Sequence, residues 1–296
     1  MSTDDSISRQ VMKFWVRAGG IDALSDSIQR HLPVYRFEGG PAISRICSTY
    51  LDTTAFSLYR DRVLEPESDH VLVRLRWYGR LGVGPVFFEM KKNGLPGQPG
   101  LKRRLPVRRD AVLAFMHGAA DPGVLAAAHS SDARRARLHA LLAELRAFVA
   151  SHDLRPTVHV QYFRRAYQRS AEDTRVRLTL DTRMSMRTAR GRDPLARFRG
   201  PVHHFPWAVL EVKLQAERPA WLVDLLRDPH VEPAPKFSKY AHGVAMLYRV
   251  EDLALPAPVW TRVHKLGGTR RIAAPRSWAA PLLPYAYGEA AQLDQA

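Results

Sequence analysis

Four stretches of this chain alternate between charged and apolar side chains, and this alternation restricts the folds that the chain can adopt. The stretches cover residues 71–78, 85–92, 175–181 and 205–215. Because successive side chains of a β-strand point to opposite faces, each stretch predicts a strand with one apolar face and one charged face. The charged residues lie two positions apart, in the pairs Arg74/Arg76, Glu89/Lys91, Arg175/Arg177 and Glu211/Lys213.

The remainder of the chain, up to about residue 250, predicts further strands and several helices. Apolar or alternating runs predict strands over residues 10–16, 43–52, 101–107 and 156–167. Helical spacing of apolar residues predicts helices over residues 21–32, 110–116, 132–151, 221–227 and 241–248, with a helical turn over residues 53–60. We find no internal repeat and no fingerprint of a P-loop or a dinucleotide-binding fold. Strands mixed with helices in this way are typical of an α+β protein.

The chain has 296 residues, which is enough for one large domain or two modest ones. We expect one domain over residues 1–250, because strand and helix patterns continue throughout it. Residues 251–296 differ in character and predict a Pro-rich C-terminal extension. The prolines that interrupt this extension include Pro256, Pro258, Pro275, Pro281 and Pro284.

The net charge of the chain points to a polyanionic partner. Lys and Arg number 45 against 29 Asp and Glu, which gives a formal charge of +16. A surplus of this size favours nucleic acid, an anionic membrane or a phosphate-rich molecule as the partner. A basic surface without a specific partner is the alternative, and it loses support if the charges prove to be ordered.

The expected location is the cytoplasm. Cys47 is the only cysteine, so no intramolecular disulfide can form, and this fits a reducing compartment. The N-terminal residues lack the basic and apolar regions of a signal peptide. We also expect no integral membrane segment, because no apolar run is long enough to span a bilayer.

Two architectures fit strands with one charged face. One is an open sheet with helices packed on its apolar face and its charges in water. The other is a closed antiparallel barrel whose apolar face packs outward against helices while the charges point into the lumen. A barrel of about eight strands has room for a ligand. Like charges that converge in a lumen repel one another and lose solvation, so they need counter-charges or a bound polyanion.

A series of short segments, in this order along the chain, resembles a known family. They are Lys13–Val16, Tyr50–Asp52, Arg74–Gly79, Phe88–Lys91, Arg165–Tyr167, Val176–Thr182, Ala208–Gln215 and Pro235–Gly243. Each segment is weak evidence alone, but together they resemble the catalytic domain of vacuolar transporter chaperone (VTC-type) polyphosphate polymerases. These belong to the triphosphate tunnel metalloenzymes of the CYTH-like superfamily. The resemblance covers residues 10–250.

The resemblance implies the second architecture and an enzymatic function. The expected fold is α+β, with a closed antiparallel β-barrel of about eight strands as the triphosphate tunnel and helices packed on its outside. The expected activity is metal-dependent transfer of the γ-phosphoryl of ATP onto a polyphosphate chain, with release of ADP. The expected partners are therefore ATP and polyphosphate, and nucleic acid is not expected.

The resemblance also assigns roles to individual residues. It implies a catalytic set of Lys13, Arg74, Arg76, Lys91, Arg165, Arg177 and Glu211. It implies further phosphate contacts from Lys213, Lys236, Ser238 and Lys239, and from Lys102, whose surroundings match the family poorly. Glu211 would hold Mn²⁺ or Mg²⁺. For Glu89 two interpretations stay open, a role at the metal or an ion pair with a lysine or arginine of the same face.

Two positions depart from the family pattern. The wider superfamily has Glu-x-Glu-x-Lys on its first strand, whereas this chain has Arg9, Val11 and Lys13 there. The loss of both carboxylates argues against a two-metal hydrolytic site and favours the polymerase branch. Phe163 stands where the family pattern predicts a tyrosine, and this would loosen one phosphate contact.

Two other functions stay open from the sequence. One is hydrolysis of a triphosphate in the same tunnel, with water as the acceptor. The other is binding of polyphosphate or nucleic acid without catalysis, which the basic charge alone favours. Against this last function, a nucleic-acid surface has little use for a metal-binding glutamate at its centre.

Overall fold

The computed structural model describes residues 10–64, 70–80, 84–93, 100–117, 132–191, 193–195, 202–249 and 253. The predicted extension over residues 251–296 therefore lies outside the described residues, apart from Leu253. None of the described helices is both long enough and apolar enough to cross a bilayer.

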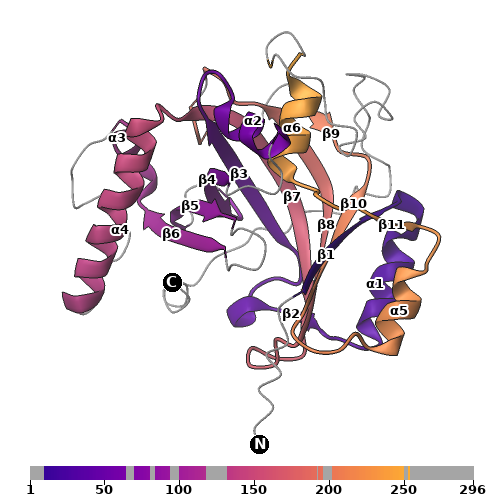
Figure 1. Cartoon of the computed structure of the whole chain (residues 1–296). Coiled ribbons are helices and arrows are strands. Elements are labelled where there is room, and N and C mark those ends of the chain that lie inside the picture. The colour runs from indigo at the N-terminus through magenta and orange to yellow at the C-terminus, as the bar shows by residue number, and fades with distance from the viewer. Residues whose placement is uncertain are drawn as a thin grey trace, which may run out of the picture.

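One antiparallel sheet of 11 strands forms the centre of the molecule (Figure 1). Its main path runs in the order β11-β1-β10-β8-β7-β3-β4-β5-β6, while β2 pairs with β7 and β9 pairs with β8. The strands are β1 (Gln10–Val16), β2 (Val34–Tyr35), β3 (Ser44–Asp52), β4 (Val71–Tyr78), β5 (Val86–Lys92), β6 (Leu101–Val107), β7 (Arg155–Tyr167), β8 (Val176–Thr188), β9 (His203–His204), β10 (Ala208–Leu214) and β11 (Val231–Pro233). All the longer strands lie where the sequence predicts them, although β8 continues well beyond its predicted end.

Helices cover the two wings and one end of the sheet (Figure 1). They are α1 (Ile21–Gln29), α2 (Ser57–Leu64), α3 (Val112–Met116), α4 (Asp132–Ser151), α5 (Ala220–Leu226) and α6 (Lys239–Leu247). The pair α3 and α4 lies beside the β4-β5-β6 wing, and α1 and α5 lie beside the wing of β1, β10 and β11. The pair α2 and α6 crosses one end of the sheet.

The sheet is open, so the predicted closed barrel of about eight strands is wrong. Its terminal strands are β6 and β11, and in the described part of the chain no ladder joins them. The alternating sequence pattern reports which face of a strand each side chain occupies. Closure into a barrel depends instead on hydrogen bonds between the two edge strands. The edge strand β11 is short, and its three residues pair with β1 on its other side. The α+β class, with helices outside the sheet, agrees with the structure.

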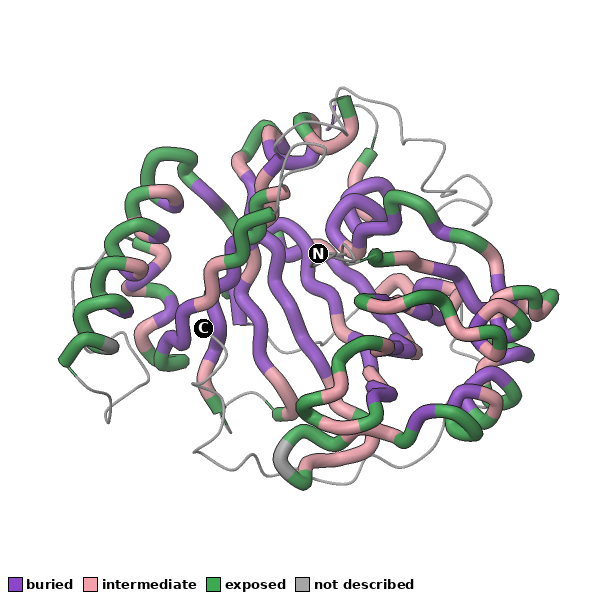
Figure 2. The backbone as a smooth tube through the Cα atoms, turned by 60° about the horizontal axis from the view of Figure 1, so that its bottom comes forward, coloured by how far each residue is buried: buried purple, intermediate pink, exposed green. Residues whose placement is uncertain are grey.

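The open sheet is nevertheless curled, so that its two wings face each other. Five inter-strand steps separate β10 from β5, which would be about 24 Å in a flat sheet. Burial lowers the pKa of Lys91 on β5, and charges on β10 also act on it, with Glu211 raising that pKa and Lys213 lowering it. Interactions of this kind require the wings to approach each other. Figure 2 shows the buried central strands between the two flanking groups of elements.

Apolar packing explains why each helix lies where it does. On one wing, Leu75, Phe88 and Leu105 pack against Leu142 and Leu145 of α4. On the other wing, the apolar sides of β10 and β8 pack in the same way against α1 and α5. A third cluster contains residues of α2 and α6 together with Tyr50, Val160 and Tyr162. This third cluster closes one end of the space between the wings.

Asp52, the last residue of the Tyr50–Asp52 motif, has a structural role. Its buried carboxylate accepts hydrogen bonds from the backbone N–H groups of Thr53 (2.7 Å), Leu58 (2.9 Å) and Tyr59 (2.9 Å). The Tyr240 hydroxyl donates to the same carboxylate. Asp52 thereby caps the start of α2 and ties both α2 and α6 to the end of β3.

We predict that Asp52→Ala lowers the free energy of unfolding by about 3 kcal/mol or more, because it leaves several buried donors without an acceptor. Asp52→Asn keeps one acceptor oxygen and should cost about half as much. Urea unfolding curves would measure both changes. Asp61→Ala, at an exposed position of α2, is the control and should change stability by less than about 0.5 kcal/mol. Equal effects of Asp52→Ala and Asp61→Ala would contradict the structural role.

Candidate functional site

The strand register brings charged residues of seven strands onto one face, which we call the charged face. Cross-strand partners share a face, and the pairs Lys13/Glu211, Lys213/Arg177, Arg164/Asp181, Arg74/Glu89, Glu89/Arg104 and Lys91/Lys102 are such partners. Tyr50 of β3 faces Arg74 in the same register. Cations outnumber carboxylates on this face, and it lies between the two wings of the curled sheet.

A first cluster on the charged face surrounds Glu89. Arg74 donates from Nε to Glu89 Oε2 at 2.7 Å, and its Nη2 lies 2.6 Å from the same oxygen. Arg76 and Arg104 approach at 3.7 Å and 3.4 Å. Burial alone would raise the pKa of Glu89, but the three guanidinium groups outweigh it and hold that pKa far below its usual value. Glu89 is therefore an ion-pair partner of this face, the second of its two interpretations.

Arg104 belongs to this cluster, although the sequence analysis does not single it out. Its guanidinium stacks 3.7 Å from the ring centroid of Phe87 and donates to the Tyr78 hydroxyl at 3.2 Å. The sequence pattern that could have identified Arg104 is its spacing of two residues from Lys102, which places both side chains on one face of β6. The side chain of Lys102 is largely accessible on that face, and the partial loss of water around its ammonium group lowers its pKa, with Glu89 raising it and Arg104 lowering it further.

A second cluster surrounds Asp181, which is 1% exposed. Arg164 donates to both carboxylate oxygens, from Nε at 2.6 Å and from Nη2 at 2.8 Å. Lys239, the first residue of α6, adds a third contact at 2.6 Å. Burial would raise the pKa of Asp181, but these cations lower it strongly. The carboxylate thus fixes the direction of the arginine fork and anchors α6 to the charged face.

A third group lies on the β1–β10 pair. Lys213 Nζ lies 2.9 Å from Glu211 Oε1, and Lys13 Nζ donates to the Phe237 carbonyl at 2.8 Å. Burial raises the pKa of Glu211, but Lys213, Arg164 and Lys13 reduce it to about 2, so the carboxylate is ionised at neutral pH. Glu211 is partly buried on the charged face and does not point to bulk solvent.

Lys13 lies in an unfavourable electrostatic position. Burial, with smaller contributions from neighbouring cations, lowers its pKa to about 8 although Glu211 raises it. A lysine whose ammonium is disfavoured in this way gains from any anion that binds beside it. Lys13 is thus a buried cation of the charged face whose charged form an anion would stabilise.

Three predicted site residues lie elsewhere. Arg165 is on the opposite face, where it donates to the Ser25 hydroxyl of α1 at 2.6 Å. Ser238 is the N-cap of α6 and accepts a hydrogen bond from the Ala241 N–H at 3.3 Å. Lys236 is exposed, just before α6, with a positive φ of 62°. Arg177 stays on the charged face, at the Lys213 end of the sheet, with its guanidinium 5.4 Å from the ring centroid of Phe37.

The placement of Arg165 reflects an error of one residue in β7. The structure brings Tyr162 and Arg164 to the charged face, whereas the family resemblance places Phe163 and Arg165 at these two positions of the site. The hydroxyl of Tyr162 accepts a hydrogen bond from Arg76 Nη2 at 3.3 Å, so the tyrosine expected at position 163 lies one residue earlier. The register of β7 on β8 shifts between Gln161 and Phe163, which makes alternation ambiguous there.

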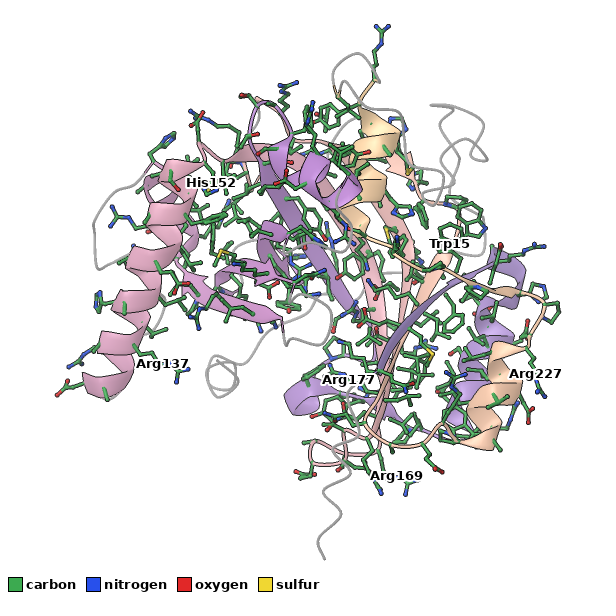
Figure 3. The ribbon with its side chains drawn as sticks, viewed as in Figure 1. Trp15, Arg137, His152, Arg169, Arg177 and Arg227 are labelled. Carbon is green, nitrogen blue, oxygen red and sulfur yellow. The ribbon has the colours of Figure 1, made fainter. Side chains whose placement is uncertain are left out.

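Many other basic residues stay outside this site. Arg137, Arg169 and Arg227 are exposed, and Figure 3 shows them at the periphery of the molecule, whereas Trp15 and Arg177 lie among the crowded side chains of the sheet. The ordered cations of the charged face are thus only part of the net charge.

Glu211 is the carboxylate of this face that best fits a divalent metal. One oxygen of Glu211 lies 2.9 Å from Lys213 Nζ. By contrast, both oxygens of Asp181 accept hydrogen bonds from Arg164, and Glu89 is surrounded by guanidinium groups. The described residues contain no cluster of three or more His, Cys, Asp or Glu side chains suited to a metal. Mg²⁺ commonly takes one or two carboxylates and completes its shell with substrate phosphates and water. The charged face therefore fits a metal that is shared with a phosphate ligand, rather than one held by protein alone.

Comparison with known proteins gives a consistent match over the same region. The family model described as "VTC domain" matches residues 8–248. Vacuolar transporter chaperone complex subunit 4 of Trypanosoma brucei brucei is 32% identical over 286 residues, which cover 85% of this chain and 36% of that protein. The subunit of the same name from Schizosaccharomyces pombe is 31% identical, covering 86% of this chain and 39% of that protein. The chain thus spans less than two fifths of the length of these relatives.

Similarity to solved structures is weaker. The PH1819 protein from Pyrococcus horikoshii OT3 aligns over 73% of this chain and 83% of its own, with a TM-score of 0.32 and 12% identity. A likeness at this level supports no conclusion about the site.

The adjacent residues Arg164 and Arg165 offer a matched test of the charged face. We predict that Arg164→Gln weakens binding of inorganic tripolyphosphate by about tenfold or more, because a charge-assisted fork is lost. Arg165→Gln removes the same charge from the opposite face and should change the affinity by less than about threefold. Isothermal titration calorimetry on both variants would measure this. Equal losses would contradict the assignment of faces, and a larger loss for Arg165→Gln would reverse it.

Proposed function

The chain belongs to the VTC domain family, and from this premise we propose that its charged face binds ATP and polyphosphate and catalyses metal-dependent phosphoryl transfer between them. The γ-phosphoryl of ATP moves onto the end of a polyphosphate chain and ADP is released. The observation that carries the proposal is the convergence of partly buried arginines and lysines on one face, in excess of the carboxylates that hold them in place.

The electrostatics of the charged face support a polyanionic substrate. Glu89 and Asp181 each bind more than one cation and are too few to neutralise the face. Burying like charges close together is unfavourable unless counter-charges are present. A chain of phosphates supplies negative charge at regular intervals, and it fits a face whose cations extend across several strands.

Phosphoryl transfer asks for alignment and charge neutralisation more than for covalent chemistry from the protein. Arg74, Arg76 and Arg164 present guanidinium groups whose orientation is already fixed by Glu89 and Asp181, so little side-chain entropy is lost when phosphate binds. Lys13, Lys91 and Lys213 add ammonium charges from the facing wings. Together these groups would hold donor and acceptor phosphates in line.

The proposed transfer balances without a general base. An oxygen of the terminal phosphate of the acceptor chain attacks the γ-phosphorus of ATP, and the bond from that phosphorus to the β–γ bridging oxygen breaks. The electron pair of that bond leaves with ADP. Because the attacking phosphate is already anionic at neutral pH, no side chain has to remove a proton from it.

Glu211 would hold the divalent ion, Mn²⁺ or Mg²⁺, together with phosphate oxygens. When bound, the ion would neutralise charge on those oxygens. Lys213 and Lys13 lie close to the Glu211 carboxylate and would contact the same phosphates.

We predict that the protein, incubated with ATP and Mn²⁺, forms long phosphate chains that a polyacrylamide gel resolves. Glu211→Gln should lower the rate of chain formation by about 100-fold or more, because the ionised metal ligand is lost. Glu217→Gln, at an exposed position soon after β10, is the control and should leave the rate unchanged.

The outcome also separates the competing functions. Release of phosphate without chains would show a hydrolase that uses the same face. Full polyphosphate binding with no metal-dependent turnover in the wild-type protein would show a binding protein and overturn the proposed catalysis.

A further inference from the structure

Arg62 of α2 is a charged residue that neither the sequence analysis nor the mechanism above uses. Its Nη1 hydrogen-bonds to Nε2 of His70, the residue just before β4. Asn93, just after β5, meets the same ring nitrogen through Nδ2 at 2.8 Å, and its backbone N–H donates to the His70 carbonyl at 3.1 Å. The side chain of Arg62 thus reaches from α2 to the end of the β4–β5 hairpin.

This arrangement fixes the position of Arg62 without neutralising it. A guanidinium group only donates hydrogen bonds, so the ring nitrogen of His70 is the acceptor in this contact. A histidine ring carries no negative charge in either protonation state, so it gives Arg62 no counter-charge. The Nε of Arg62 is buried and has no hydrogen-bond partner among the residues that the structure describes.

Arg62 lies at the end of the space between the two wings that α2 and α6 close. His70, which Arg62 contacts, and Asn93, which contacts His70, each lie two residues from the cross-strand pair Leu72/Lys91 on the charged face. Arg62 also acts electrostatically on both wings, because its charge contributes to the lowered pKa values of Lys13 on β1 and Lys91 on β5. Burial lowers the pKa of Arg62 itself, and within the described ranges the group that raises it is Tyr50, not a carboxylate.

We infer that Arg62 is a phosphate-binding residue that extends the charged face from the sheet onto α2. A partly buried guanidinium group near two lysines and beside an imidazole, which carries no negative charge, is unfavourable in the free protein. A phosphate between Lys13 and Lys91 would accept a hydrogen bond from the Arg62 guanidinium group and supply negative charge, which no carboxylate of the described residues is shown to give it. His70 and Asn93 then act as positioning residues that aim the guanidinium group. The inference rests on the proposed function, because it adds a ligand contact to the same site.

The test compares Arg62→Gln with Arg60→Gln, which removes the same charge two residues earlier on α2. Arg60 instead donates to the Leu253 carbonyl. Calorimetry with inorganic tripolyphosphate should show affinity lowered by about tenfold or more for Arg62→Gln and by less than about twofold for Arg60→Gln. Equal affinity of Arg62→Gln and wild type would overturn the inference. Failure of the wild-type protein to bind tripolyphosphate would instead refute the proposed function.

A second measurement needs no variant and so does not depend on how Arg62→Gln folds. Wild-type protein is treated with phenylglyoxal, which modifies accessible arginines, with and without saturating tripolyphosphate, and modified peptides are quantified by mass spectrometry. Ligand should reduce modification of Arg62 several-fold while leaving the exposed Arg227 unchanged. A purely structural Arg62 would be modified to the same extent with and without ligand, and that result would overturn the inference.

Discussion

The structure depends on the ion pairs that hold several arginines on the inner side of a curled sheet. Glu89 forms ion pairs with Arg74, Arg76 and Arg104, and Asp181 forms ion pairs with Arg164 and Lys239. These carboxylates are buried and accept hydrogen bonds from groups on neighbouring strands and on α6. Burying these carboxylates costs desolvation energy, and the ion pairs offset this cost because the nitrogen and oxygen atoms lie at hydrogen-bond distance. In return they orient guanidinium groups that would otherwise repel one another, so the cations are arranged before any ligand arrives.

This arrangement connects the fold to the proposed chemistry. Helices α1, α5, α3 and α4 cover the apolar side of the sheet, so the charged side is left for a ligand. Helices α2 and α6 close one end, and both contribute cations, Arg62 and Lys239. Asp52 holds this end together through hydrogen bonds to α2 and α6. Packing, helix capping and ion pairing thus all serve to present one positively charged surface between two wings.

Much of this could be predicted from the sequence, because a period of two assigns side chains to faces wherever a strand is regular. Alternation correctly places Arg74, Arg76, Lys91 and Glu211 on one face. It failed in β7, where a register irregularity lies beside two adjacent arginines and either could face inward. Alternation also could not show whether the sheet closes into a barrel, because pairing between the edge strands β6 and β11 would leave no periodic pattern in the sequence. The role of Arg62 could not be predicted from periodicity, because its position depends on a tertiary contact with His70, which Asn93 of the next strand end contacts in turn.

The central claim is that the charged face, including Arg164, binds a chain of phosphates. A crystal structure of the protein with inorganic tripolyphosphate and Mn²⁺ tests it most directly. The account predicts phosphate oxygens within hydrogen-bond distance of Arg74, Arg76 and Arg164, and a metal bound by Glu211 and phosphate. Tripolyphosphate bound on the outer helices, with the ion pairs of Glu89 and Asp181 undisturbed and the space between the wings filled only by water, would contradict it.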